Sequence, residues 1–557
     1  MKRLLLLLIL ITASAIGLAA AEPAELVLLN ARIYTVDPYL KLAQALAIRE
    51  GRIVAVGTTE EMKHWTGPDT KVVDLDGKLV LPGFNDAHTH LGHAGAELIS
   101  VNLKDTRSIA ELQQRIRARL ASYAPGEWVT GSGWDQSLWA ENRYPTRADL
   151  DPVSSEHPMM FTRVDGHSAI ANSRALELAG ITRDTPDPEG GEIVRDAQGE
   201  PTGWLKENAT ELVARLIPAP TMEWRKRALA AALAEAARYG VTSVQDDSVR
   251  FGSWENFLAM RELKNEGKLT LRITEWLPFD LPIEKLKEMQ REGGTDDPWL
   301  RTGALKYQID GSGGSRTAAM LEPFAVEPAN RGMMFYEPEE LKRLVVERDA
   351  AGFQMALHAI GDRAIRVTLD AFQAARAANG RRESRHKIEH VQYVHREDVP
   401  RFKELGVIAS MQPCHLLAEI RWTRTLLGPE REHQAYAVNS LLKAGAVVAL
   451  GTDYPVENIP PLRGLYAAVA REFEAGGPAG GWQPQERINL EQAIRAYTWG
   501  SAYAEFSEAK KGTLTPGKFA DLVVLSKDIT RLPARELLDT EVLLTMVGGR
   551  IVYEKKE

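Results

Sequence analysis

The sequence predicts an α/β protein: a (β/α)8, or TIM, barrel with a discontinuous β-sandwich formed by the two ends of the chain. Three features support this prediction. The middle of the chain alternates strand-like and helical segments, with eight candidate strands; β-rich segments without helical periodicity stand at both ends; and several helical runs end in a glycine just before the next strand. The chain has 557 residues, of which 44% are hydrophobic and 26% are charged, as is typical of a globular protein.

The first residues have the pattern of a secretory signal peptide. Lys2 and Arg3 precede an unbroken apolar run, and small residues lead to an alanine triplet that ends at Ala21. We therefore expect residues 1–21 to be removed and the mature chain to be exported, to the periplasm or the extracellular space. An uncleaved membrane anchor is the alternative, because this run nearly reaches spanning length. No other segment does, so we expect no membrane attachment after cleavage.

Residues 22–82 and 511–557 are expected to form the two parts of the sandwich. Both contain short β-rich runs joined by turns, such as residues 26–35 and 542–555. Neither part alone offers much core, so we expect them to fold together.

Residues 83–510 are expected to form a barrel whose interior strands alternate with amphipathic helical runs, such as residues 224–239. Residues 97–220 do not fit one strand–helix unit and hold two further β-like runs. We interpret them as a large insertion after the first strand. The eight predicted barrel strands are residues 83–90, 241–247, 271–277, 304–310, 354–360, 386–391, 407–413 and 446–453.

Charge and cysteine content exclude several kinds of partner and site. A formal net charge of -8 argues against a basic nucleic-acid-binding surface. Cys414 is the single cysteine, so an intramolecular disulfide and a cysteine-rich zinc or iron–sulfur site are excluded. Any metal site must therefore use His, Asp, Glu or Lys side chains, and the chain has 12 histidines.

Histidine and carboxylate side chains stand where the predicted strands end. The first strand ends in His88 and His90, whose imidazoles share one face because they are two residues apart. His358, His390 and Asp453 stand at the ends of strands 5, 6 and 8. Each has an ordinary alternative explanation, as a chance pair, a core histidine or a helix N-cap. Because the carboxyl ends of barrel strands meet at the active-site face, their joint placement favours a metal site.

Lys306 lies inside the fourth predicted strand. A buried cationic amine is costly without a partner, whereas a neutral amine can react with CO2 to give a carbamate that bridges two metal ions. A structural salt bridge to Asp310 or Glu275 is the alternative. With the carbamate the ligands suffice for two divalent ions, and we expect Zn2+, with Mn or Fe as alternatives.

Several motifs together resemble the amidohydrolase superfamily over essentially the whole mature chain. The broad resemblance rests on LPGFNDAHTH (81–90) and GTLTPGKFADLVVL (512–525). A narrower resemblance, to amidohydrolase family 3 and its branch of N-substituted formamide deformylases, rests on DGHSAIANS (165–173), IDGSGGSRTA (309–318), LHAIGDRAI (357–365), IEHVQ (388–392) and GTDYPV (451–456).

The resemblance implies a metal-dependent hydrolase that acts on an amide-like C–N bond of a small molecule. It implies that His88 and His90 bind the more buried metal and that Lys306, as a carbamate, bridges the two ions. It further implies that His358 and His390 bind the second metal.

Asp453 would touch the buried metal and handle protons. A metal-activated hydroxide would attack the carbonyl, and Asp453 would pass its proton to the leaving nitrogen. The products would be an amine and a carboxylic acid, such as formate. A deaminase, for which Glu207 is a candidate base, a cyclic-amide hydrolase and a non-catalytic relative remain alternatives. The substrate and a homo-oligomeric state are left open.

The insertion and the loops after strands 4 and 7 are expected to shape the substrate pocket. Arg163 or Arg316 could hold a substrate carboxylate, with structural salt bridges as the alternative. Asp86, beside the first strand, could orient a ligand imidazole or make a loop hydrogen bond. The candidate substrate-binding residues are Trp134, Arg163, His167, Asp310, Arg316 and Gln412.

Overall fold

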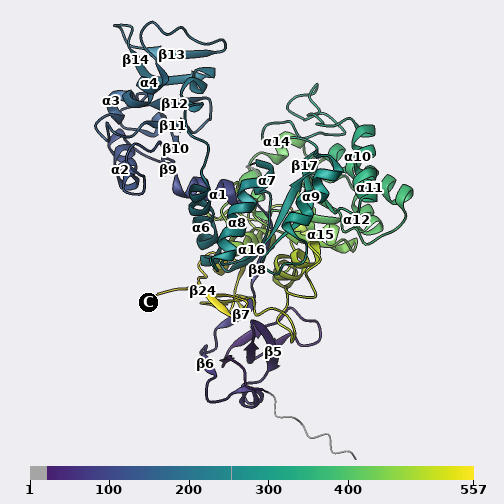
Figure 1. Cartoon of the computed structure of the whole chain (residues 1–557). Coiled ribbons are helices and arrows are strands. Elements are labelled where there is room, and N and C mark those ends of the chain that lie inside the picture. Colours follow the sequence, from purple (N-terminus) through teal and green to yellow (C-terminus); the bar gives the residue numbers. More distant parts are fainter. Residues whose placement is uncertain (1–21, 252–253, 557) are drawn as a thin grey trace, which may run out of the picture.

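The computed structural model describes residues 22–251 and 254–556, which form a sandwich lobe, a central barrel and an insertion lobe (Figure 1). The predicted signal peptide, residues 1–21, lies outside the described residues. Among the helices that are described, none is both long and apolar enough to cross a bilayer.

All eight predicted barrel strands are present, and they pair in parallel in the order β21-β20-β19-β18-β17-β16-β15-β8. Nearly every residue of these strands is buried, as expected for a sheet covered by helices. This confirms the predicted fold class. The strands are β8 (Phe84–Thr89), β15 (Val241–Asp246), β16 (Arg272–Pro278), β17 (Leu300–Gln308), β18 (Met355–Ala359), β19 (Lys387–His390), β20 (Ile408–Met411) and β21 (Val448–Leu450).

The barrel closes through the segment that follows β21. The Asp453 N–H donates to the His88 carbonyl at 2.8 Å, and the His90 N–H donates to the Tyr454 carbonyl at 2.8 Å. The buried Asp86 carboxylate accepts hydrogen bonds from the N–H and the hydroxyl of Thr452, at 2.9 and 2.6 Å. Closure therefore fixes Asp453 beside the two histidines of β8.

Helices surround the barrel, and several end as the sequence predicted. At the end of α12, for example, Gly406 adopts a left-handed conformation, and its N–H bonds back to the last helical turn. The helices outside the insertion are α1 (Leu91–Ile99), α6 (Met222–Arg238), α7 (Ser248–Phe251), α8 (Trp254–Asn265), α9 (Ile283–Gly293), α10 (Pro338–Ala350), α11 (Asp362–Asn379), α12 (Val399–Leu405), α13 (Pro413–Glu419), α14 (Thr423–Leu427), α15 (Val438–Lys443), α16 (Pro461–Ala470), α17 (Leu490–Arg495) and α18 (Ser501–Ala504).

The two ends of the chain share one sheet, as predicted. The C-terminal strand β22 pairs with the N-terminal strand β7 in the order β24-β23-β22-β7-β2-β3, and a second sheet has the order β5-β4-β1-β6. One apolar cluster draws on both segments, with Ile33 and Leu46 packed near Leu522 and Met546. The strands are β1 (Leu26–Leu29), β2 (Arg32–Tyr34), β3 (Leu42–Ala43), β4 (Ala45–Arg49), β5 (Arg52–Gly57), β6 (Lys71–Asp74), β7 (Leu79–Pro82), β22 (Leu522–Leu525), β23 (Val542–Val547) and β24 (Arg550–Glu554).

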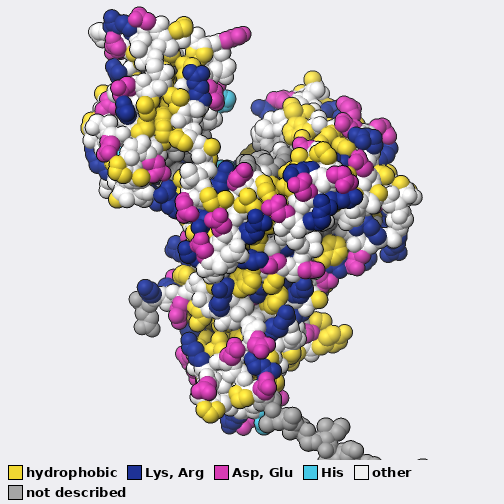
Figure 2. Space-filling model, viewed as in Figure 1, with side chains coloured by type: hydrophobic (Ala, Val, Ile, Leu, Met, Phe, Trp, Pro, Cys, Tyr) yellow, Lys and Arg dark blue, Asp and Glu magenta, His cyan; other side chains and the backbone are white. Residues whose placement is uncertain are grey.

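The insertion forms a separate lobe between α1 and α6, and Figure 2 shows an open gap between this lobe and the barrel on the face in view. It is built on one six-stranded sheet, of order β13-β14-β12-β11-β10-β9, with apolar clusters of its own. Its elements are β9 (Val101–Asn102), α2 (Ile109–Leu120), β10 (Val129–Trp134), α3 (Arg147–Leu150), β11 (Met159–Arg163), β12 (Ser168–Ala171), α4 (Ser173–Ala179), β13 (Gly191–Arg195), β14 (Pro201–Glu207) and α5 (Glu211–Ala214).

Candidate metal centre

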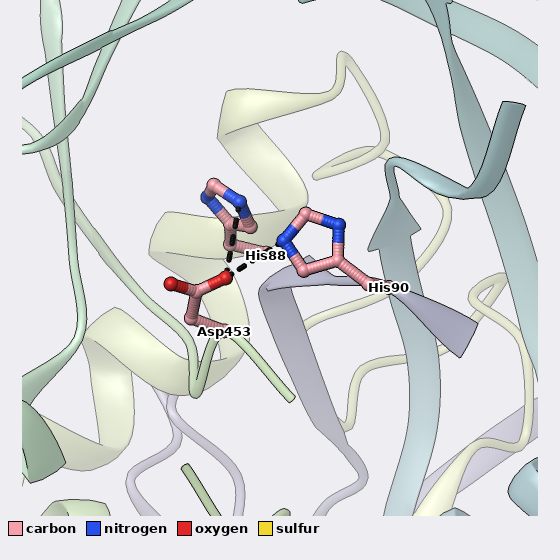
Figure 3. A group of neighbouring side chains, drawn as sticks. All are labelled: His88, His90 and Asp453. Atoms are coloured by element: carbon pink, nitrogen blue, oxygen red, sulfur yellow. Dashed lines mark hydrogen bonds and ion pairs between the residues drawn. The ribbon is translucent and has the colours of Figure 1, made fainter. Parts of the chain in front are cut away.

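Three predicted ligands converge at the carboxyl end of the barrel. His88 and His90 come from the end of β8, and Asp453 follows β21 (Figure 3). The Oδ1 atom of Asp453 lies 2.8 Å from Nε2 of His90 and 3.5 Å from Nε2 of His88. One nitrogen from each imidazole and one carboxylate oxygen lie within 4.8 Å of one another, which suits a divalent metal ion.

A second group shares Asp453 with two further histidines. His390, at the end of β19, and His415, on α13, each offer a nitrogen within 4.8 Å of the other donor atoms of this group. The Nε2 atom of His415 is buried and has no hydrogen-bond partner among the described residues. The sequence reasoning missed His415, although it lies three residues after Gln412, at the end of a predicted strand.

His358 lies beside this second group, although it is not one of its three members. Its ring packs edge-on against His390, with 4.4 Å between the ring centroids. Its Nε2 atom lies 3.2 Å from the Gly311 carbonyl oxygen and 3.4 Å from Oδ1 of Asp310. The predicted pairing of His358 and His390 thus places two adjacent rings at the centre, with His415 as an additional donor.

Lys306 points into the centre from β17 and is 2% exposed. Its Nζ atom lies 3.2 Å from Nε2 of His88 and 3.5 Å from Oδ2 of Asp247. The alternative salt-bridge partners predicted from the sequence are engaged elsewhere: Asp310 accepts hydrogen bonds from three backbone N–H groups, and Glu275 accepts one from the Val249 N–H. Lys306 is therefore placed against a ligand imidazole of the proposed metal centre.

Burial and mutual charge prepare these side chains to bind a cation. Burial lowers the pKa values of His88 and His390 well below that of an ordinary histidine, which keeps both imidazoles neutral. Burial alone would raise the pKa of Asp453, but the surrounding imidazoles, His88 first, hold it well below its usual range. Burial would also lower the pKa of His90, but its hydrogen bond to Asp453 raises it, so this ring would have to release a proton when a metal binds.

A buried glutamate orients one of these imidazoles. Oε2 of Glu389 lies 2.9 Å from Nδ1 of His88, so Nε2 of that ring faces Asp453 and Lys306. The sequence reasoning had suggested Asp86 for this task. Asp86 instead binds the His88 backbone N–H and Thr452, and thus positions the chain rather than the imidazole. Glu389 is the acidic residue of the IEHVQ motif, so the sequence could have indicated this role.

The centre forms part of the wall of a cavity of about 800 Å³, a size typical of small-molecule sites. The wall includes an apolar part, with Trp224, Ile360 and Val456, and a partly buried cation, Arg225. The sequence reasoning did not select Arg225, which lies in a helix of ordinary amphipathic composition.

Three candidate substrate-binding residues lie in the insertion lobe and do not line this cavity. Trp134 is buried there, and its indole N–H donates to the Phe161 carbonyl at 2.8 Å. Arg163 forms ion pairs with Asp135 and Asp165. The third residue, His167, forms an ion pair with Glu207.

His167 is exposed, and its Nδ1 atom lies 3.1 Å from Oε2 of Glu207. This pairing also places Glu207, the candidate base of the deaminase alternative, away from the metal centre. The family-like motif of the insertion therefore contributes no cavity wall in this arrangement.

The other three candidates lie closer to the centre. Gln412 accepts a hydrogen bond from Nδ1 of His390 at 2.8 Å, so it orients a proposed ligand. Asp310 is saturated by backbone N–H groups, as described above. Arg316 is largely exposed and forms an ion pair with Glu327 at 2.6 Å, the structural role that had been the alternative to substrate binding.

Comparison with known proteins agrees with this geometry. A model described as Amidohydrolase family matches residues 71–553. The N-substituted formamide deformylase of Arthrobacter pascens is 31% identical over 544 residues, covering 95% of this chain and 98% of that protein. The protein LONG AFTER FAR-RED 3 of Arabidopsis thaliana is 36% identical over 538 residues, covering 95% and 92%.

A solved structure described as an uncharacterized metal-dependent hydrolase from Pyrococcus furiosus has a TM-score of 0.74 and 30% identity, and the match covers 90% of this chain and 99% of that one. These matches confirm the resemblance that the sequence motifs predicted.

Proposed function

Since the chain belongs to the amidohydrolase family, we propose that it is a metal-dependent hydrolase that cleaves a formamide-like or other N-acyl C–N bond of a small molecule. The observation that carries this proposal is the convergence of His88, His90 and Asp453 with a second histidine group on one wall of a cavity of about 800 Å³. The Arthrobacter relative, named an N-substituted formamide deformylase, supports the choice of bond.

The donor set fits two divalent ions, and its imidazoles favour Zn2+, with Mn or Fe as alternatives. His88, His90 and Asp453 would hold one ion, and His390 would hold the other with His358 or His415. The buried, unbonded Nε2 atom of His415 supports this fit, because a buried polar atom without a partner is costly. When bound, the metal supplies a water of lowered pKa and polarises the scissile carbonyl.

We propose that Lys306 is carbamylated and bridges the two ions. An ammonium group 3.2 Å from Nε2 of His88 would repel a metal bound at that nitrogen. A carbamate formed from CO2 replaces this positive charge with an anion at the same place. The burial of Lys306 supports this proposal, because a buried ammonium is costly and only one carboxylate of the described residues, Asp247 at 3.5 Å, lies within ion-pair distance of it.

Asp453 is the proposed proton carrier. Its carboxylate lies among the imidazoles that hold it ionised, so it can accept a proton from the nucleophile and deliver it to the leaving nitrogen. Glu389 and Gln412 keep the rings of His88 and His390 in place during this transfer.

We further propose that the mature chain begins near Glu22 and is exported to the periplasm or the extracellular space. The basic start, apolar run and alanine triplet of residues 1–21 support this proposal. Intact mass of protein from the exporting host measures it, and an unprocessed chain retained in the membrane would contradict it.

The function is tested with purified protein loaded with Zn2+ or Mn2+ against N-formyl amines, N-acyl amines, cyclic amides and aminopurines. We expect turnover of N-formyl or N-acyl amines, metal present in the protein, and loss of turnover in Asp453→Asn but not in Arg316→Gln. Turnover confined to cyclic amides or aminopurines would favour the alternative activities. No turnover by metal-loaded protein on any panel would favour a non-catalytic relative.

A further inference from the structure

Arg225 is a cation on the cavity wall that the proposed metal chemistry does not use. Of the described residues that line the cavity, Lys306 and Arg225 are the two that carry an amine or a guanidinium. Lys306 belongs to the metal centre. Arg225, in the first turn of α6, is partly buried, and it takes part in no ion pair between described side chains.

Neutral groups hold Arg225 in place. Its Nη1 atom donates to Oδ1 of Asn256 at 2.6 Å, and Nδ2 of Asn256 donates to the Ser248 carbonyl at 3.1 Å. Ser248 directly follows Asp247, the carboxylate next to Lys306. The guanidinium is thus tied to the edge of the metal centre while its charge stays uncompensated. Since a guanidinium presents five donors, most of its hydrogen-bonding capacity is available to a ligand.

The acidic side chains of the cavity are already engaged. Glu457 forms an ion pair with Arg463, and Glu419 accepts a hydrogen bond from the Tyr393 hydroxyl at 3.3 Å. Asp247 and Asp453 belong to the metal centre. Arg225 is therefore the cation of this cavity that is left for a substrate, and it stands beside an apolar part of the wall that includes Trp224.

We propose that Arg225 determines specificity by binding a carboxylate on the substrate, so that the preferred substrates are N-formyl or N-acyl amines with a carboxylate and an apolar side chain. A guanidinium matches a carboxylate through two parallel N–H···O bonds. Arg163 and Arg316, the anchors predicted from the sequence, form ion pairs, whereas Arg225 forms none with the described residues and takes this role. This inference rests on the proposed hydrolysis of such amides.

The test compares two substrates that differ by the carboxylate alone: N-formylphenylalanine, as both enantiomers, and N-formyl-2-phenylethylamine. In the metal-loaded Arg225→Gln variant, kcat/KM for the preferred enantiomer should fall about 10- to 100-fold, mainly through KM, as expected for loss of a charged hydrogen bond. For the neutral formamide it should stay within about threefold. For Arg225→Lys, kcat/KM should lie between those of the wild type and Arg225→Gln, because lysine keeps the charge but cannot form two parallel hydrogen bonds. Arg316→Gln is the matched control.

The possible outcomes distinguish a failure of the carboxylate anchor from a failure of the proposed hydrolase function. Equal losses on both substrates, or no loss, would overturn the carboxylate anchor, provided that metal content and thermal unfolding match the wild type. Wild-type hydrolysis of the neutral formamide without hydrolysis of N-formylphenylalanine would overturn it as well, and the proposed function would stand. If the metal-loaded wild type hydrolyses no formamide or N-acyl amine, the proposed function fails and the anchor fails with it.

Discussion

The two ends of the barrel bury the same kinds of charged side chain but partner them differently. At the amino-terminal end, Glu505 accepts hydrogen bonds from Asn85 at 2.6 Å and from Arg301 at 3.0 Å, and it pairs with Lys511 at 2.6 Å. Thr274 donates to the same carboxylate. Every lone-pair direction of this carboxylate has a donor within reach, so the cluster is electrostatically complete.

A second complete pair joins the barrel to the sandwich at the same end. Arg272 of β16 binds Asp521, just before β22, through two hydrogen bonds of 2.7 and 2.9 Å. Asp521 also accepts the Gly548 N–H at 2.8 Å. Such bidentate, fully hydrogen-bonded pairs fix the relative position of the elements that they join.

At the carboxyl-terminal end, by contrast, several buried polar groups lack a bonding partner within the described part of the chain. Nε2 of His415 and Nε2 of Gln412 are buried without a hydrogen-bond partner among the described residues, and Lys306 stands against a ligand nitrogen. In a barrel of this kind the carboxyl-terminal face carries chemistry and the opposite face carries stability. The two ends therefore differ in their charged and metal-binding side chains: Glu505 and Asp521 have donors on both oxygens, whereas the proposed ligand His415 keeps an open nitrogen.

The largest expected effect comes from Lys306→Ala at the incomplete end. If the carbamate bridges two ions, this variant should lose the second metal and its turnover, because both ions lose a shared anionic ligand. Elemental analysis and kcat/KM measure the two effects. Short carboxylic acids added to the variant should restore part of both, by replacing the bridge. Two bound metals and normal turnover in Lys306→Ala would refute the carbamate.

Asp453→Asn should reduce turnover by about 10²- to 10⁴-fold, the range for loss of a general acid–base group. The amide keeps the shape and one oxygen ligand, so metal should persist. Steady-state kinetics and elemental analysis on the same sample check this. Normal turnover would move the proton carrier to another residue.

Glu505→Gln should lower stability and leave turnover unchanged, because it removes the charge from a carboxylate whose oxygens all have donors. Removing one partner of a buried charged network costs about 3–5 kcal/mol of unfolding free energy, while kcat per folded, metal-loaded molecule should not change. Urea unfolding monitored by circular dichroism measures the loss. Asp453→Asn in metal-free protein is the comparison, and we expect it to cost much less, since it relieves an incompletely bonded cluster.

The same cluster predicts a pH dependence. Burial would raise the pKa of Glu505, but Lys511 and Arg301 lower it from its ordinary 4.5 to about 2. A carboxyl whose pKa is lower in the folded state stabilises the fold above its unfolded pKa, and this contribution is lost as the pH falls from about 4.5 towards 2. Wild-type stability should therefore fall over this interval, and the fall should be smaller in Glu505→Gln.

The barrel and the positions of the proposed ligands on its strands were predictable because they depend on local pattern. Eight apolar runs separated by amphipathic helices determine the sheet, and register then places His88, His358 and His390 at one end. Asp453 follows from the same rule, because it comes directly after the last strand. The sandwich was predictable because neither terminal segment could bury a core alone.

Other parts of the site were not predictable because they depend on contacts between distant segments. His415 and Arg225 lie on helices, where spacing does not reveal which side chain reaches the cavity. The insertion motifs predicted substrate contacts for Trp134 and His167, but the position of that lobe depends on tertiary contacts, such as β9 against α1 and the ion pair between Arg227 and Glu127. Sequence pattern gives no measure of such packing.

Glu389→Gln is the prediction with the smallest expected effect, and it tests whether the functional end also contains complete bonds. Gln keeps an oxygen near Nδ1 of His88 but loses the charge that orients and polarises the ring. Loss of such an outer carboxylate lowers metal affinity or activity by about 10- to 100-fold. Competition of each variant with a zinc-binding dye measures the affinity, and Arg316→Gln is the control. Unchanged affinity together with unchanged turnover would show that the β8 backbone, tied to Thr452 through Asp86, suffices to hold the ring.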